Sequence, residues 1–295
     1  MKFAPFLLFS GCLTAQVPTK QPGRLPYDLS QPAKVFELPS ALMEVSALTD
    51  IDSITVACVQ DEQASMYKIS LKDGQIVGIY PFGGPADMEG LTNVNGEYFA
   101  LRSDGLIYHL QFRLQEAISL AVVDTFRLDV PNKNIEGLGF DERNERILIS
   151  PKDFIKGSKE TKDERMLYAI DPKDPAHKVE TVLKLSLEAL SAQAVQMGLD
   201  LPTRTTDDCR VLSALKLRYS SVAVNPFTDH YYLLSAADRT LLVVDRQGAL
   251  VDLVLLDAHL LPKPEGITFM ANGDMWLASE GKERTPVLAK YAFRK

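Results

Sequence analysis

The feature that most constrains the fold of this chain is a four-residue phrase that returns about every forty-five residues. The copies are Glu44-Val-Ser-Ala, Glu89-Gly-Leu-Thr, Glu136-Gly-Leu-Gly and Glu265-Gly-Ile-Thr, together with Ser220-Ser-Val-Ala, which lacks the glutamate. Only the interval between the third copy and the Ser220 copy is long, at about twice the usual period. A repeat of this length is typical of a β-propeller, in which each blade is a sheet of four antiparallel strands.

Short runs rich in β-branched and aromatic residues follow each copy and are bounded by Asn, Asp, Gly and Pro, as short strands require. The first copy is expected to form a strand over Val45–Leu48, with a turn over Asp50–Ser53. The last copy ends on a third run, Val287–Phe293, and lacks a fourth, but a spare run, Lys34–Leu38, precedes the first copy. Pairing these two runs would close the ring and remove two open sheet edges. The sequence therefore predicts an all-β, five-bladed propeller over residues 34–295.

The long interval leaves a six-bladed propeller as the alternative, because it contains about forty extra residues. Those residues lack the pattern of strands. Apolar residues recur there at helical spacing before a stop at Gly198, namely Leu187, Leu190, Ala194 and Met197. A second short helix is expected to begin at Asp207 or Asp208. We therefore predict a helical insertion over residues 186–218 that shapes access to one face of the propeller.

The N-terminus has the pattern of an export signal over residues 1–15, with a charge at Lys2 and an apolar run over Phe3–Phe9. Two outcomes of processing are open. Leu8-Phe-Ser-Gly-Cys12 resembles a bacterial lipobox, which would attach a lipid to Cys12, whereas simple cleavage would follow Ala15. The proline-rich residues 16–33 are typical of a tether. We expect an exported protein, either in the periplasm or attached to the outer membrane or cell surface as a lipoprotein.

Charge and composition argue against several classes of function. The formal net charge is −7 and no Lys/Arg cluster exceeds a dipeptide, so nucleic-acid binding is not expected. Contact with a membrane is expected only through a lipid at the N-terminus, and the propeller is expected to be a monomer. The four histidines lie at unrelated places in their repeats, which argues against a histidine metal site.

The glutamates of the phrase are the candidate functional residues. The innermost strands of a propeller face one central channel, so Glu44, Glu89, Glu136 and Glu265 are expected to meet at one mouth of it. The second strands return to the same face, which adds Asp61, Glu62, Asp104, Lys152 and Glu280 as candidates. Crowded carboxylates need a cation, a lysine partner or raised pKa values, and a ring of oxygen ligands suits Ca²⁺. Alternatively, each glutamate accepts backbone N–H bonds from a neighbouring loop and serves only the fold.

These phrases resemble those of the SdiA-regulated family of bacterial propellers, which is adjacent to the phytase-like esterase propellers. The resemblance covers about residues 36–295. It rests on Met43-Glu-Val-Ser-Ala-Leu48, Asp87-Met-Glu-Gly-Leu91, Ile135-Glu-Gly-Leu-Gly-Phe140 and Lys263-Pro-Glu-Gly-Ile-Thr-Phe269. It implies a five- or six-bladed, exported or envelope-attached propeller, sometimes with bound calcium, and no established reaction. The chain departs from the family at Val45, Ala47 and Ser220, and the last of these leaves a gap in the acidic ring.

Two functions follow from these observations. The first is an exported propeller that binds calcium at an acidic channel mouth and there binds a ligand or an envelope protein. The alternative is a metal-dependent hydrolase of a lactone or phosphate ester, gluconolactonase-like or phytase-like. Only Lys152 and Arg102 could hold phosphates near this face, which ranks the hydrolase second. The sequence names no catalytic residue, since it has no Gly-x-Ser-x-Gly motif.

Overall fold

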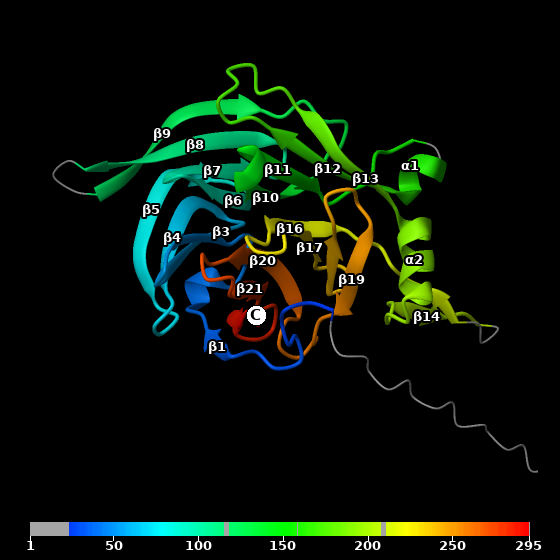
Figure 1. Ribbon diagram of the computed structural model, residues 1–295. Coiled ribbons are helices and arrows are strands. Elements are labelled where there is room, and N and C mark those ends of the chain that lie inside the picture. Colours follow the sequence, from blue (N-terminus) through cyan, green and yellow to red (C-terminus); the bar gives the residue numbers. More distant parts are fainter. Residues whose placement is uncertain (1–23, 115–117, 158, 208–210, 295) are drawn as a thin grey trace, which may run out of the picture.

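The computed structural model describes residues 24–114, 118–157, 159–207 and 211–294. Five four-stranded antiparallel sheets are arranged as blades around a central channel, as the sequence predicts (Figure 1). The innermost strands contact one another around the ring in the order β2, β6, β10, β16, β20 and back to β2. The fold is therefore a closed five-bladed propeller, and the six-bladed alternative is wrong.

The blades follow the chain in order. The first contains β2 (Thr49–Asp52), β3 (Thr55–Gln60), β4 (Gln63–Ser70) and β5 (Ile76–Pro85). The second contains β6 (Met88–Val94), β7 (Glu97–Arg102), β8 (Leu106–Leu114) and β9 (Ile118–Arg127). The third contains β10 (Ile135–Asp141), β11 (Arg146–Pro151), β12 (Glu164–Ile170) and β13 (Glu180–Ser186). The fourth contains β16 (Tyr219–Val224), β17 (Tyr231–Ser235), β18 (Thr240–Val244) and β19 (Leu250–Leu255). The fifth contains β20 (Lys263–Phe269), β21 (Met275–Glu280), β22 (Val287–Tyr291) and β1 (Lys34–Glu37).

The first blade differs from the expectation at its inner strand. β2 runs over Thr49–Asp52, where the sequence predicts a turn, and Val45 makes only an isolated bridge to Gln60. Two short 3₁₀ turns, over Ser40–Leu42 and Glu142–Asn144, lie before the first blade and between β10 and β11. Among the described residues, no helix is long and apolar enough to cross a membrane.

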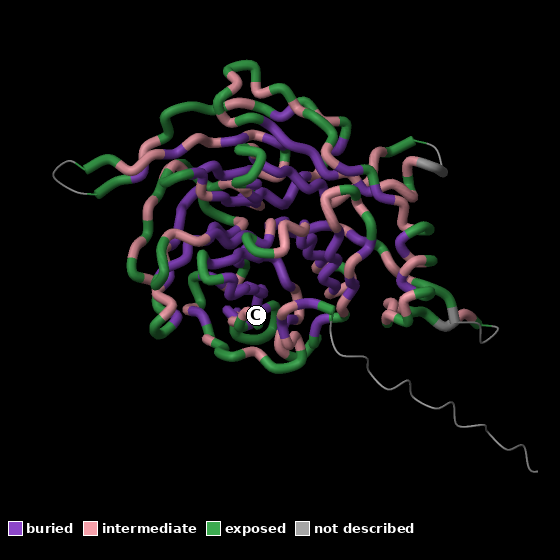
Figure 2. Tube along the Cα trace, in the orientation of Figure 1, coloured by how far each residue is buried: buried purple, intermediate pink, exposed green. Residues whose placement is uncertain are grey.

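The hydrophobic core is divided among the five junctions between blades. Each cluster of buried side chains draws on two neighbouring sheets, and the buried residues follow the strands in Figure 2. At the junction of the fourth and fifth blades, for example, Tyr232 and Leu241 pack with Met275 and Leu277. Because each blade buries one face against each neighbour, its strands need apolar residues on both faces, which explains their nearly continuous apolar runs.

The glycine of the repeated phrase lies where neighbouring inner strands come closest. A Cβ atom at Gly137 would lie 2.1 Å from Ser150 Oγ and 3.0 Å from Ser221 Cα in the next blade. A Cβ atom at Gly266 would lie 2.8 Å from the Cβ of Leu48, across another junction. Glycine is thus required because the next backbone occupies the place of a side chain.

The ring closes through the N-terminal strand, as predicted. β1 pairs antiparallel with β22, from Lys34 opposite Lys290 to Glu37 opposite Val287. The ring of Phe36 in β1 stacks on Trp276 of β21, with centroids 6.0 Å apart. This pairing turns two open sheet edges into one continuous fifth blade.

The residues just before β1 also pack on the propeller. Tyr27 is buried, donates a hydrogen bond of 2.7 Å to the carbonyl oxygen of Gly273 and accepts one of 2.6 Å from Asn225 Nδ2. Leu25 is buried in the same cluster. The tether expected over residues 16–33 is therefore wrong for residues 24–33. Residues 16–23 and the expected export signal, with Cys12, lie outside the described residues.

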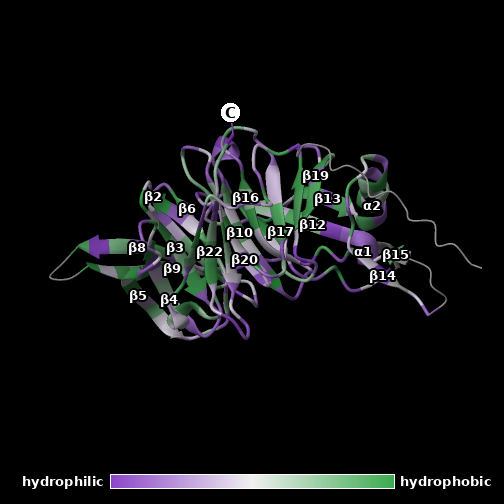
Figure 3. Ribbon diagram, turned by 90° about the horizontal axis from the view of Figure 1, so that it is seen from below, coloured by the Kyte–Doolittle hydropathy of each residue, from purple (hydrophilic) through white to green (hydrophobic). Residues whose placement is uncertain are grey.

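The insertion between the third and fourth blades contains one helix and one hairpin. α2 (Leu187–Gln196) begins at Ser186, whose Oγ accepts a hydrogen bond from the Ala189 N–H, and it contacts β13 and β19. In place of the second helix, β14 (Thr203–Thr205) pairs with β15 (Val211–Ser213). A short helix that the sequence did not predict, α1 (Lys159–Asp163), precedes β12. Figure 3 places these elements together at one edge of the disc, so α2 packs on outer strands and does not lie over the channel.

Removing residues 1–38 should destabilise the whole propeller, because the deletion removes both β1 and the buried Tyr27. We expect a loss of at least about 3 kcal/mol in the free energy of unfolding, which is typical of losing large buried side chains. Removing residues 1–23 is the matched control and should leave the urea midpoint unchanged. Equal midpoints for the two truncated proteins would show that β1 does not close the ring.

The variant Gly137→Ala should lose about 1–3 kcal/mol of stability, as overpacked sites do. Its new methyl group would collide with the Ser150 side chain and the Ser221 backbone. Gly84→Ala is the control, since a Cβ atom there has no neighbour within 4 Å. Urea denaturation measures both, and equal stability of the two variants would contradict the close contact.

Candidate functional sites at the two channel ends

The glutamates of three blades occupy one equivalent place, a β-bulge at the start of the inner strand. The strand pairing shifts by one residue at Glu89, Glu136 and Glu265, and at Ser220 in the fourth blade. A bulge leaves its extra residue outside the ladder and changes the direction of its side chain. The charges of Glu89, Glu136 and Glu265 act on one another. We call this end of the channel, where the inner strands begin, the acidic end.

The structure places Glu44 differently from the other three glutamates. Its carbonyl oxygen accepts a hydrogen bond from the Asp61 N–H, just as the Asp87 carbonyl accepts one from Ser103. Glu44 therefore corresponds to Asp87, two residues before Glu89, and Ser46 takes the equivalent position in the first blade. The Glu44 side chain is exposed. The expected fourfold set of equivalent glutamates is thus a set of three, with serines in the first and fourth blades.

Two lysines of the chain lie among these carboxylates. Lys152 Nζ forms an ion pair with Glu136 Oε1, which also accepts a hydrogen bond of 3.1 Å from Asn134 Nδ2. Lys263 Nζ lies 3.1 Å from Glu265 Oε1 and also pairs with Glu280. The sequence predicts Lys152 as a counter-charge. Lys263 also stands two residues before Glu265 in the sequence. The contact between the two side chains was not predicted, because the sequence does not show the β-bulge at Glu265 that brings them together.

The carboxylates of the acidic end hold their protons more tightly than free ones. Burial raises the pKa of Glu89 to about 9, helped by the negative charges of Glu136 and Asp87 and opposed by Lys152. Burial likewise raises the pKa of Glu265 to about 8, although Lys263 opposes the shift. Because the folded pKa of Glu89 exceeds its ordinary value of 4.5, its contribution to stability is present below that value and is lost as the pH rises through about 9.

Two of the other candidate residues, Asp61 and Glu280, lie within range of each other's charge. The pKa of Asp61 is raised to about 7, first by burial, then by the hydrogen-bonding carboxylate of Glu44 and by the charge of Glu280. The Oδ1 atom of Asp61 is buried and has no hydrogen-bond partner in the described part of the chain. Two other candidates, Asp104 and Glu62, do not interact with these carboxylates. Asp104 is held by Arg102 and Arg127, at 2.8 and 3.1 Å, and Glu62 is exposed.

These side chains, as they lie, do not fit calcium. Ca²⁺ takes six to eight oxygen ligands. Glu136 and Glu265 each already hold an ammonium group of the chain itself. Within the described residues, no three His, Cys, Asp or Glu side chains are close enough together to hold a metal ion. Calcium binding at Glu44, Glu89, Glu136 and Glu265 stays a prediction.

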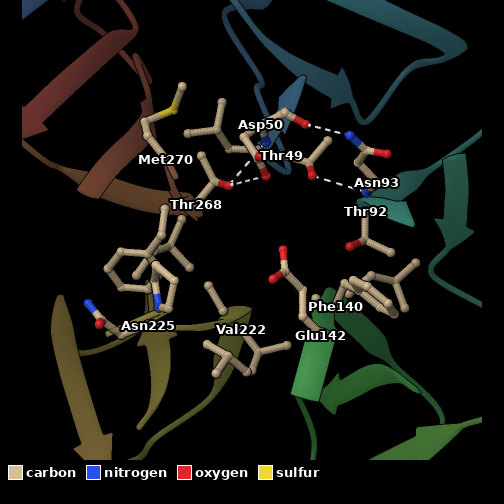
Figure 4. Close-up of a pocket in the computed structure, with 18 of the residues that line it drawn as sticks. Thr49, Asp50, Thr92, Asn93, Phe140, Glu142, Val222, Asn225, Thr268 and Met270 are labelled. Carbon is tan, nitrogen blue, oxygen red and sulfur yellow. Dashed lines mark hydrogen bonds between the residues drawn. The ribbon is translucent and has the colours of Figure 1, made fainter. Parts of the chain in front are cut away.

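The opposite end of the channel contains a pocket of about 650 Å³ that the sequence analysis missed (Figure 4). We call it the channel pocket. Its inner wall is formed by the residues two places after each bulge position, namely Leu48, Leu91, Leu138, Val222 and Ile267. The next residue in each blade is Thr49, Thr92, Gly139, Ala223 or Thr268. The available signal was the threonine that ends two copies of the repeated phrase, Thr92 and Thr268.

Charged groups surround the outer part of the channel pocket. Asp229 pairs with both Arg143 and Arg246, and Arg246 also holds the fully buried Asp141. Asp50 and Glu142 also line the pocket. Burial raises the pKa of Asp50, and the charge of Glu142 adds to the shift. This end therefore combines buried apolar residues of the inner strands with polar and charged groups at its opening.

Comparison with solved structures supports the fold. The chain is similar to glutaminyl cyclase of Myxococcus xanthus, with a TM-score of 0.54 and 12% identity over 89% of this chain and 95% of that one. It is also similar to the PQQ-bound aldose sugar dehydrogenase of Streptomyces coelicolor, with a TM-score of 0.50 and 11% identity over 88% and 97%. At such low identity these likenesses show the fold alone. Among proteins with curated functions, no sequence matches this chain.

A family model matches most of the propeller. The model for SdiA-regulated proteins matches residues 32–283, which include the three bulge glutamates and both lysines of the acidic end. The repeated phrase, the closed ring of five blades and this match agree. The chain belongs to the SdiA-regulated family.

Proposed function

We propose that this protein is a binding propeller that takes a ligand or partner with a positively charged group at the acidic end of its channel. The observation that carries the proposal is the state of Glu89. Its carboxyl group is half-buried beside Glu136, and among the described residues it has no hydrogen bond or ion pair. Glu136 and Glu265, the equivalent glutamates, each have a lysine partner. Glu89 is therefore the position at which a third positive group would complete the arrangement.

A positive group beside Glu89 would change its protonation. The pKa of this carboxyl is raised to about 9 by burial and by neighbouring negative charges, so it holds a proton at neutral pH. A bound cation favours the ionised form, so binding releases that proton. Affinity for the cation should therefore rise as the pH increases from 7 towards 9. An exposed carboxylate would show no such dependence in this range.

The chemistry of the site favours an ammonium or guanidinium group over a metal ion. The chain already meets two of the three equivalent glutamates with lysine ammonium groups. Such a group needs only a few acceptors, whereas calcium needs six to eight oxygens. Calcium is the other candidate, and it would have to displace Lys152 or Lys263 from its partner. Export, attachment through a lipid at Cys12, a monomeric state and an envelope protein as partner are parts of the proposal that rest on the sequence.

Acid–base chemistry is the second candidate function. A carboxyl group whose pKa is raised to about 9, close to a lysine, has the properties of a general acid at neutral pH. This observation favours the hydrolase of a lactone or phosphate ester in a form in which Glu89 donates a proton and no metal is required. A panel of lactones and phosphate monoesters tests it, with Glu89→Gln as the inactive comparison.

Thermal unfolding at pH 8 with putrescine, and separately with CaCl₂, tests the proposed site. We expect putrescine to raise the melting temperature of the wild type by more than that of Glu89→Gln, because the amide cannot balance an ammonium group. At about 100 times its dissociation constant a ligand adds roughly 2.7 kcal/mol of stability. Asp104→Asn is the control, since its carboxylate is already held by arginines, and it should respond like the wild type.

The two ligands separate the candidate cations. Stabilisation by CaCl₂ alone, abolished in the double variant Glu89→Gln with Glu136→Gln, would identify a metal site instead. If neither ligand stabilises the wild type, or if Glu89→Gln responds as the wild type does, the acidic end is a structural device and the proposal is wrong.

A further inference from the structure

Three threonines at equivalent positions line the channel pocket, and two of them form hydrogen bonds between neighbouring blades. The hydroxyl of Thr49 accepts a hydrogen bond of 3.1 Å from the Asn93 N–H of the second blade. The hydroxyl of Thr268 accepts one of 3.1 Å from the Asp50 N–H of the first blade. Each bond joins neighbouring inner strands. A threonine in this position therefore normally ties one blade to the next.

The third threonine, Thr92, lacks that bond. The residue is 2% exposed, and among the described residues its hydroxyl makes no bond like those of Thr49 and Thr268. In Figure 4 the hydroxyl oxygen points into the channel pocket. The Thr92 hydroxyl is not one of the fully enclosed polar atoms that lack a partner in the described chain, so it opens to the pocket and is a candidate for contact with a ligand.

Two carboxylates of the channel pocket also lack a positive partner. Figure 4 shows the carboxylate of Glu142 directed into the pocket, with Asp50 on the neighbouring wall. Within the described chain, neither forms an ion pair. The arginines at the opening do not supply one, because Arg143 pairs with Asp229, and Arg246 pairs with Asp229 and Asp141. The pocket thus has two carboxylates without an ion-pair partner in the described chain and one threonine hydroxyl that ties no blades together.

Part of the wall of the same pocket is apolar. Phe140 of the third blade and Val224 of the fourth line it and are only half-buried. Sites for small organic molecules commonly combine such a wall with a few converging polar groups, in volumes between about 300 and 1,000 Å³. A bare metal ion would leave this wall uncovered by ligand, and an anion would meet the two carboxylates.

We propose that the channel pocket binds a small organic amine, with its ammonium group between Asp50 and Glu142 and its apolar body against Phe140 and Val224. The Thr92 hydroxyl accepts a hydrogen bond from the ammonium group. This site is separate from the acidic end, which lies at the other end of the same inner strands. Binding here does not depend on Glu89.

Benzylamine is a suitable probe because it pairs an ammonium group with a compact apolar body, and benzyl alcohol is its neutral analogue. Ligand-observed NMR and titration calorimetry at pH 7 measure both on the full chain. We expect benzylamine to bind with one-to-one stoichiometry and benzyl alcohol to bind at least about tenfold more weakly, as the loss of a charge-assisted contact implies.

Variants locate the binding. Glu142→Gln should weaken benzylamine binding at least about tenfold, and Thr92→Val should weaken it about three- to tenfold, the range for one hydrogen bond. Glu145→Gln is the matched control, because Glu145 ends the same turn but pairs with Lys173 at 2.8 Å outside the pocket. This variant should bind like the wild type.

Several results would overturn the proposal. One is equal affinity for benzylamine and benzyl alcohol, which would mean that the charge has no role. Another is unchanged binding in Glu142→Gln with loss of binding in Glu89→Gln, which would place the amine at the acidic end. Absence of benzylamine binding to the wild type would also contradict it. Failure of the putrescine experiment alone would affect the acidic end and leave this site standing.

Discussion

The close approach of the inner strands at the glycines of the repeated phrase is the contact on which the rest of the structure depends. Gly137 meets the Ser221 backbone of the fourth blade, and Gly266 meets Leu48 of the first. Side chains there would push the blades apart. Ala47 takes the place of this glycine in the first blade and Ser221 in the fourth, both of them small residues. The inner strands therefore lie close together, and the charged side chains at their first residues interact electrostatically.

The acidic end is a direct consequence of that close approach. Bulges place Glu89, Glu136 and Glu265 within range of one another's charge. For scale, two unit charges about 4 Å apart repel by roughly 4 kcal/mol at an effective dielectric near 20. The chain reduces this repulsion in two ways. Lys152 and Lys263 pair with Glu136 and Glu265, and Glu89 keeps a proton. The lysine pairs need no partner from outside the chain. The protonated Glu89, in contrast, can release its proton when a positively charged ligand binds beside it.

The period of the sequence predicted the large features well. It predicted five blades, closure of the ring by residues 34–38 and convergence of the three equivalent glutamates, because these follow from spacing and alternation alone. The sequence comparison aligned Glu44 with Glu89, whereas the structure aligns Ser46 with Glu89. The error arose because Glu44-Val-Ser-Ala resembles the other copies and because the β-bulge cannot be recognised in the sequence. The hairpin β14–β15 and the packing of Tyr27 were missed because three-residue strands and a single buried tyrosine depend on tertiary contacts. The channel pocket was missed for a related reason, since five separate strands have to be superimposed before its threonines become visible as a set.

The protonation of Glu89 is the central claim, and a carboxyl ¹³C NMR titration of labelled glutamates tests it most directly. Comparison with Glu89→Gln assigns the signal. The structure predicts a midpoint at about pH 9, since burial and the charges of Glu136 and Asp87 both oppose ionisation. A midpoint near the ordinary glutamate value of 4.5 would show that this carboxyl is ionised at neutral pH, and the account of the acidic end would be wrong.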